Sequence, residues 1–208
     1  MSLIDRFIIE FDTALRSVVG GANANRPTPG SSSSNQSLDS AQRQHAAGLM
    51  RVNHVGEICA QALYQSQKLL ARNSEIQAML NHSAQEEMDH LAWCEVRLQE
   101  LGSHTSYLNP LWYAGSFAIG LIAGLAGDKW SLGFVAETEK QVEAHLENHL
   151  EKLPVDDQRS RAIVDQMRID EIEHGQAALH AGGVTLPEPI QKIMQTVSKV
   201  MTSTAYKI

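Results

Sequence analysis

The chain has 208 residues, 43% of them hydrophobic and 20% charged, which is enough for one domain with a sizeable buried core. The formal net charge of −7, from 24 acidic and 17 basic residues, argues against nucleic acid as a partner and against membrane attachment through a basic patch. Cys59 and Cys94 show no Cys-x-x-Cys spacing, so neither a disulfide framework nor a zinc knuckle is indicated.

Residues 1–18 are predicted to form an amphipathic helix, because their apolar residues recur at helical spacing. Asp5, Glu10 and Asp12 interrupt these apolar residues, unlike the uninterrupted apolar run of a signal peptide, so the protein is expected to remain unexported. Residues 19–36 are rich in Gly, Ser, Asn and Pro and are predicted to be a flexible linker.

From residue 38 onward the pattern predicts helices and no strand, so the expected fold class is all-α. Ser74 with Gln77, Asn109 before Pro110, and Asp128 are interpreted as helix N-caps. The last predicted helix carries an apolar stripe. The predicted helices cover residues 40–72, 74–101, 109–126, 128–153, 157–181 and 187–202.

One predicted helix differs from the others, because residues 111–126 contain no charged side chain. Its 16 apolar and neutral residues fall short of the roughly 20 that a bilayer crossing needs. Two interpretations stay open: a helix that lies in the membrane interface, and a helix buried in the protein core.

Two segments repeat one pattern of an acid, a glutamate, an apolar residue, an acid and a histidine: EEMDH at 86–90 and DEIEH at 170–174. Each contains Glu-x-x-His, which puts a carboxylate and an imidazole one helical turn apart on the same face. With 15 glutamates and 9 histidines, composition alone predicts about 0.65 such pairs, so the matching flanks carry the weight. The pairs are Glu87 with His90 and Glu171 with His174.

A further glutamate precedes each copy on the previous predicted helix. Glu57 lies 30 residues before Glu87, and Glu139 lies 32 residues before Glu171. The chain therefore contains twice an αα-hairpin that offers Glu and then Glu-x-x-His. Glu87, Glu139 and Glu171 share helical faces with apolar residues and are expected to point inward, whereas Glu57 lies on a more polar face.

Four buried carboxylates must be protonated or matched by cations, since an unpaired buried charge costs several kcal/mol. Two divalent ions supply this charge, and one imidazole per metal among carboxylates suits iron or manganese. A Glu from each of two helices with Glu-x-x-His from two others is the arrangement of ferritin-like di-metal proteins. Residues 38–208 are therefore predicted to form a ferritin-like four-helix bundle, with an extra apolar helix between its halves and amphipathic helices at the chain ends. The predicted metal ligands are Glu57, Glu87, His90, Glu139, Glu171 and His174.

Several other polar residues lie near these positions in the sequence. His54 and Glu143, one turn from Glu57 and Glu139, are candidates either for supporting the ligands or for structural roles. The role of His145 is left open. The remaining acids are expected to face solvent or neighbouring helices: Glu86, Asp89, Glu137, Asp170 and Glu173.

Four motifs resemble those of the demethoxyubiquinone hydroxylase family of ubiquinone biosynthesis: NHVGE at 53–57, EMDH at 87–90, ETE at 137–139 and DEIEH at 170–174. The likeness covers roughly residues 40–208 and includes the uncharged helix between the two halves. It implies a di-iron mono-oxygenase that uses dioxygen to hydroxylate the ring of a polyprenyl demethoxy-quinol, the step before the final O-methylation. It places Glu57, Glu87 and His90 on one side of the site and Glu139, Glu171 and His174 on the other, with Glu87 and Glu171 bridging.

The same resemblance suggests NADH as the electron source, yet the chain has no Gly-x-Gly-x-x-Gly fingerprint, so another reductant or a partner protein is the alternative. The implied partners are the polyprenyl quinol, the membrane surface and other ubiquinone-biosynthesis proteins. The implied location is peripheral, on the cytoplasmic face of the cell membrane.

Three other functions compete with this interpretation. A ferritin- or rubrerythrin-like iron-oxidising or peroxide-handling protein uses the same ligands, but the chain lacks the cysteines for a rubrerythrin thiolate site. A di-iron hydroxylase of a tRNA base is disfavoured by the acidic charge. A helical membrane adaptor gives no reason for six inward metal ligands.

Overall fold

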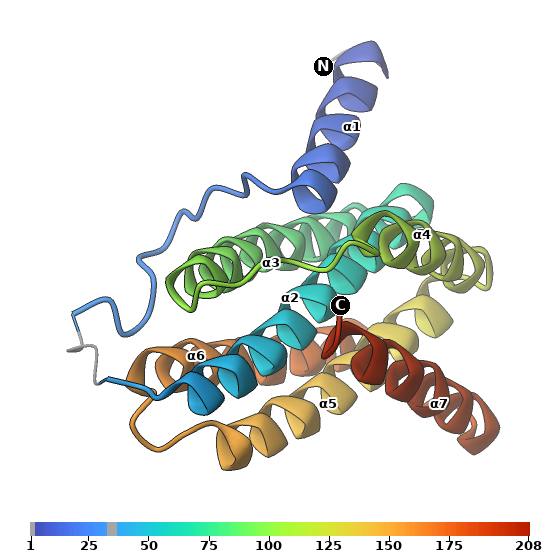
Figure 1. Ribbon diagram of the computed structural model, residues 1–208. Helices are drawn as coiled ribbons and strands as arrows, with labels where there is room; N and C mark the ends of the chain where they lie inside the picture. The colour runs from blue at the N-terminus through green and yellow to red at the C-terminus, as the bar shows by residue number, and fades with distance from the viewer. Residues whose placement is uncertain (1–2, 33–36) are drawn as a thin grey trace.

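The computed structural model describes residues 3–32 and 37–208, and this part of the chain contains seven α-helices and no strand (Figure 1). Residues 1–2 of the predicted N-terminal helix, residues 33–36 of the predicted linker, and the side chains of Leu3, Arg6 and Phe7 lie outside the described part. The all-α prediction is confirmed. The helices are α1 (Leu3–Val19), α2 (Ser40–Leu70), α3 (Ser74–Glu100), α4 (Asn109–Leu125), α5 (Asp128–Lys152), α6 (Gln158–His180) and α7 (Glu188–Ala205).

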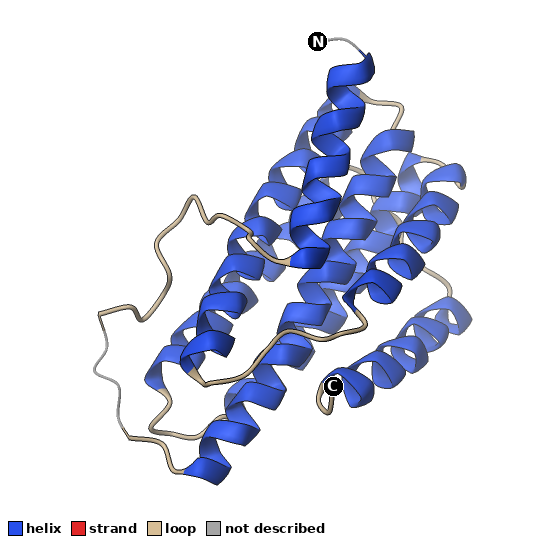
Figure 2. Cartoon of the chain, turned by 45° about the horizontal axis from the view of Figure 1, so that its top comes forward, coloured by secondary structure: helices blue, strands red, loops and turns tan. Residues whose placement is uncertain are grey.

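Four long helices form the bundle, as two hairpins that pack against each other. α2 packs on α3, α5 packs on α6, and the hairpins join through contacts of α3 with α6 and of α2 with α5. Figure 2 shows that these helices run side by side along most of their length. The fold is therefore the ferritin-like bundle that the repeated motif predicts.

Two apolar clusters fill the bundle at different levels along its axis. One contains Met50, Trp93 and Met167, and the other contains Leu80 and Leu132. Along each of the four helices, the predicted metal ligands lie between the residues of the first cluster and those of the second. The core thus consists of three layers along the bundle axis, with a layer of acids and histidines between two apolar layers.

The uncharged helix α4 connects the two hairpins and packs along α2. Gly120 and Gly124 are buried against α2, while Leu111, Ile122 and Leu125 on other faces of the helix are 62–70% exposed. Complete burial in the core, one of the two interpretations of this segment, is therefore wrong. Among the described residues, no helix is long and apolar enough to span a bilayer.

The terminal helices leave much of their apolar surface uncovered. α1 is attached to α2 by its polar side, where Glu10 pairs with Lys68 at 2.7 Å and accepts a hydrogen bond from Gln65. Its Ile4 and Ile8 are more than half exposed. α7 contacts α2 and α5, and its Ile193, Val197 and Val200 are likewise more than half exposed.

Three predicted N-caps are wrong by one residue, although the predicted helix ranges begin where α3, α4 and α5 begin, at residues 74, 109 and 128. Asn73, not Ser74, caps α3 by accepting a hydrogen bond from the Glu75 backbone N–H. α4 has no side-chain cap, because Asn109 is already its first helical residue. At the start of α5 the capping position belongs to Gly127, whose φ of 97° favours glycine, and Asp128 instead accepts from the Arg72 backbone.

We expect Gly120→Ala to destabilise the protein by about 1–3 kcal/mol, because a Cβ there would lie 3.0 Å from the Leu63 carbonyl oxygen and would collide with Ser66. Gly115→Ala, in the same helix, is the matched control. Its added Cβ meets no atom within 4 Å, so it should be neutral or stabilise by up to about 1 kcal/mol. Urea unfolding of both variants measures the difference, and equal effects would contradict this account of how α4 packs.

Candidate metal centre

The structure buries all six predicted ligands in the middle layer of the bundle. Their exposure is 5% or less, and they come from α2, α3, α5 and α6. Glu57 is as buried as the others, although its helical face is more polar, because the polar residues of that face, including Asn53 and Gln61, are buried with it. The hydrophobic pattern of α2 therefore underestimated how far this helix enters the core.

Two histidines place their Nδ1 atoms among the carboxylates. His90 Nδ1 lies 3.2 Å from Glu87, 3.5 Å from Glu171 and 3.6 Å from Glu57. His174 Nδ1 lies 3.3 Å from both Glu87 and Glu171. Glu87 and Glu171 thus reach both imidazoles, one from each hairpin.

Four of the six residues, Glu57, Glu87, His90 and Glu171, form a compact group whose potential ligand atoms lie within 4.8 Å of one another. Glu139 lies beside this group, and its Oε1 accepts a 2.6 Å hydrogen bond from the buried Tyr64 hydroxyl. Tyr64 is a site residue that the sequence pattern did not identify.

The outer nitrogen of each histidine contacts an acid from the opposite hairpin. His90 Nε2 on α3 lies 2.8 Å from Asp170 on α6, and His174 Nε2 on α6 lies 2.8 Å from Glu86 on α3. An N–H at Nε2 donates to the carboxylate and leaves Nδ1 free for a metal. Glu86 and Asp170 were expected only to face solvent or a neighbouring helix, so this role was missed. The signal was present, because each of these acids precedes the glutamate of its Glu-x-x-His.

The other polar residues considered near the site are elsewhere. His54 is buried with its Nε2 3.6 Å from Glu95, whereas the exposed Glu173 lies outside the cluster. Glu137 accepts a hydrogen bond from Gln141 on its own helix. His145 packs on His149 with ring centroids 3.9 Å apart, and Glu143 interacts electrostatically with Arg168.

The electrostatics of the acid layer show why it needs cations. Burial raises the pKa of Glu57 and Glu139 well above the usual range, and neighbouring carboxylates raise it further. Burial alone would lower the pKa of His90, but its hydrogen bond to Asp170 and the three glutamates around its Nδ1 raise it well above its usual value. Protons therefore partly compensate the acids in the absence of a metal.

The cluster fits a metal for a second reason. Glu87 Oε1, Glu139 Oε2 and Glu171 Oε1 are buried without a hydrogen-bond partner. A buried oxygen without a partner is costly, and a metal ion satisfies such atoms while displacing the protons. The mixed carboxylate and imidazole donor set suits iron or manganese. The buried cluster is thus compatible with a metal site.

An apolar pocket of about 530 Å³ reaches this layer from one side. It lies between α2, α4, α5 and α7, and Glu57 belongs both to its wall and to the compact acidic group. Trp112, Ile119 and Ile193 contribute apolar surface to the wall, and His145 also lines it. The pocket is large enough for an aromatic ring with part of an apolar chain.

Fold and site together define a ferritin-like helical bundle with a buried carboxylate–imidazole centre. Comparison with known proteins narrows this class. A family model described as "Ubiquinone biosynthesis protein COQ7" matches residues 44–205, and the chain belongs to this family.

Curated relatives agree with this membership. The chain is 84% identical to a protein of Polynucleobacter necessarius and 81% identical to one of Polynucleobacter asymbioticus, in both cases over the full length of each chain. It is 57% identical to a protein of Cupriavidus metallidurans, over 99% of this chain and all of the relative. All three relatives are named 3-demethoxyubiquinol 3-hydroxylase. The family resemblance drawn from the motifs is confirmed.

We expect Glu171→Gln to lose at least one metal ion per chain, because the neutral amide binds a cation far more weakly than a carboxylate and Glu171 lies near both histidines. Glu173→Gln, an exposed change two residues along the same helix, is the control and should keep the wild-type content. Iron in the purified proteins is measured by elemental analysis after anaerobic loading with ferrous iron. Full occupancy in Glu171→Gln would exclude this residue as a ligand.

Proposed function

We propose that the chain is a di-iron mono-oxygenase that hydroxylates the ring of a polyprenyl demethoxy-quinol, the reaction that the name of its relatives describes. The observation that carries this proposal is that Glu57 belongs both to the wall of the apolar pocket and to the buried acidic cluster. Of the added dioxygen, one atom enters the ring and the other leaves as water. This balance takes two electrons and two protons from a reductant.

Two iron ions would match the charge of the four buried glutamates. Glu57, Glu87 and His90 would hold one iron, and Glu139, Glu171 and His174 would hold the other. Glu87 and Glu171 lie close to the Nδ1 atoms of both histidines, which supports a shared centre for the two irons. Bound there, the irons supply the redox chemistry that activates dioxygen.

The protein's own side chains prepare the site for this chemistry. Asp170 and Glu86 orient the two imidazoles, and Tyr64 holds its proton on the hydroxyl that donates to Glu139. The raised pKa of Tyr64, caused first by burial and then by the Glu139 charge, keeps this donor protonated. The apolar walls of the pocket exclude water from the side where the quinol ring would enter.

We propose NADH or another electron donor as the reductant. The chain has no Gly-x-Gly-x-x-Gly fingerprint, so the donor must reduce the site without a dinucleotide-binding domain in this chain. Two routes need no such domain: delivery of electrons through the quinol itself, and delivery by a partner protein of ubiquinone biosynthesis.

We also propose that the protein binds to the cytoplasmic face of the cell membrane through α1, α4 and α7. The rim of the pocket is apolar, because four of its lining residues are also exposed to solvent: Leu111 and Ile119 on α4, and Ile193 and Val197 on α7. An isoprenoid tail in the bilayer would enter between these two helices. With a net charge of −7, the attachment would depend on apolar contacts.

The proposed reaction is tested with iron-loaded protein, a short-chain demethoxy-quinol, NADH and oxygen-18 gas, with analysis of the product by mass spectrometry. We expect one labelled oxygen in the ring, and no labelled product from Glu171→Gln. Iron oxidation without ring label in the wild-type protein would reject this substrate class and favour an iron-oxidising or peroxide-handling function.

A pocket variant separates substrate binding from the metal site. A Cβ at Gly56, in the pocket wall, meets no atom within 4 Å, so the side chain of Gly56→Phe can start without a clash and extend into the pocket. It should keep its iron and lose hydroxylation, while Gly56→Ala should retain both. Full activity in Gly56→Phe would show that the quinol binds elsewhere.

For membrane binding, we expect the double variant Ile122→Glu and Leu125→Glu to bind uncharged phosphatidylcholine vesicles about tenfold more weakly or worse, because two exposed apolar side chains lose their burial in lipid. Vesicle flotation measures the bound fraction. Val155→Glu replaces an equally exposed apolar residue in the α5–α6 connection, away from the three helices, and should bind as the wild type does (Figure 1). Equal binding by all three proteins would exclude α4 from the membrane contact.

A further inference from the structure

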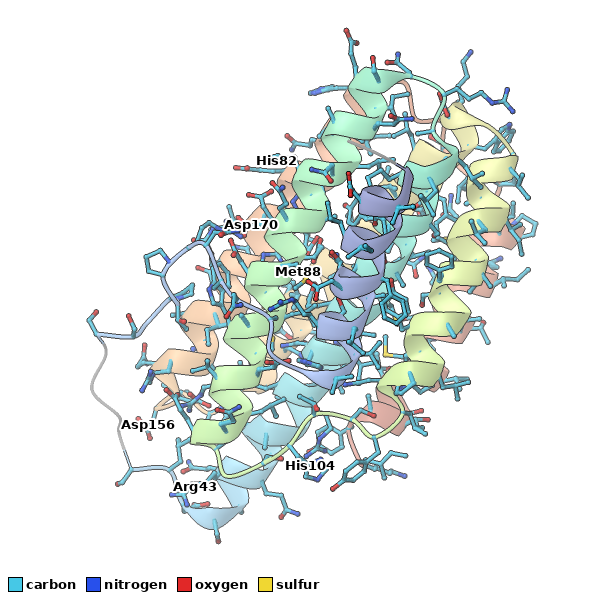
Figure 3. All side chains as sticks on the ribbon, turned by 90° about the horizontal axis from the view of Figure 1, so that it is seen from above. Arg43, His82, Met88, His104, Asp156 and Asp170 are labelled. Carbon is cyan, nitrogen blue, oxygen red and sulfur yellow. The ribbon has the colours of Figure 1, made fainter. Side chains whose placement is uncertain are left out.

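A non-helical segment covers the side of the bundle formed by α3 and α6. Residues 20–32, named here the N-terminal strap, run from the end of α1 along this side (Figure 3). The Asn25 backbone N–H donates to Asp89 at 2.6 Å, and Trp93 Nε1 donates to the Arg26 carbonyl at 3.4 Å. Gly30, with a φ of 70°, lies against Arg159 of α6. A stretch predicted only as a linker therefore makes specific contacts with the bundle.

Arg26 of the strap lies among three carboxylates. Its guanidinium is 2.7 Å from Asp89, 2.9 Å from Asp170 and 3.6 Å from Glu86. It also lies over the Trp93 ring, 4.8 Å from the centroid, a cation–π contact that fixes its plane. The planar fork of an arginine contacts several carboxylates at once, which a lysine does less well.

Two of these three acids are the ones that orient the histidines. Asp170 contacts His90 Nε2 and Glu86 contacts His174 Nε2, each at 2.8 Å. Arg26 therefore contacts both supports of the metal-binding imidazoles, one from each hairpin. Asp89, the third acid, contacts the strap at both Asn25 and Arg26 and so anchors it.

We propose that Arg26 is a positioning residue for the metal centre. When the strap is docked, its guanidinium holds Asp170 and Glu86 in the geometry that points both Nδ1 atoms at the metals, so docking of the strap governs how firmly iron is retained. This inference rests on the proposed di-iron site. The pocket lies on the α2 and α5 side, whereas Arg26 acts from the α3 and α6 side, so its loss leaves the pocket walls unchanged.

The test is the rate at which ferrous iron leaves the anaerobically loaded full-length protein for the chelator ferrozine. Arg26→Gln should release iron about 10- to 100-fold faster than the wild type, the usual effect of losing a support behind a metal-binding histidine. Arg26→Lys should restore part of the retention. Mössbauer spectra of the loaded proteins report the ligand geometry directly and should differ between wild type and Arg26→Gln. Unchanged release and unchanged spectra would overturn the proposal.

Two further variants control for a general structural effect. Arg168→Gln removes an arginine from a surface pair with Asp165 on α6 and should leave iron release unchanged. Asp89→Asn removes the anchor of the strap without touching an imidazole, and should accelerate release in the same direction as Arg26→Gln. Wild-type behaviour in Asp89→Asn would contradict the role of docking. A wild-type protein that binds no iron would reject the proposed function itself, which is a different result from equal release by all variants.

Discussion

Four glutamate side chains share one buried layer of the bundle, and the free energy of keeping their charges out of water is the constraint on which the remaining structure depends. Apolar packing above and below the layer holds the four helices together, but it also removes the solvent that would screen the acids. The layer is tolerable only with cations or protons inside it. The raised pKa of Glu57 and Glu139 favours protons as the compensating charge at these two residues. The oxygens of Glu87 and Glu171 that lack a hydrogen-bond partner fit compensation by a metal ion.

The two sides of this layer differ in a way that suits an oxidation of an apolar substrate. The α2 and α5 side opens on an apolar pocket, whereas the α3 and α6 side carries the polar contacts of the histidines with Asp170 and Glu86. Substrate and charge compensation therefore do not compete for the same space. The buried carboxylates reach the pocket at Glu57, so a bound ring would meet the acidic cluster beside this residue.

The sequence predicted the all-α fold and the six clustered residues because both depend on helical periodicity. A residue one turn from another shares its face in any helix, so Glu-x-x-His needs no tertiary information. Contacts between hairpins depend on packing. A single sequence predicts them only where a repeated motif indicates which residues correspond in the two hairpins. The pairing of Asp170 with His90 had such a signal, in the acid that precedes each motif. No such signal marked Arg26, because a non-helical segment has no periodicity from which the contacts of its side chains can be predicted.

The crossed contacts of His90 with Asp170 and of His174 with Glu86 also bear on how the protein folds. Each hairpin pairs two consecutive helices across a short connection, which favours its early formation, but each histidine is supported by the opposite hairpin. Neither half of the chain holds a complete site. The cluster comes into being only when the hairpins dock, so metal binding at this cluster would report the docking of the hairpins and not the formation of either hairpin alone.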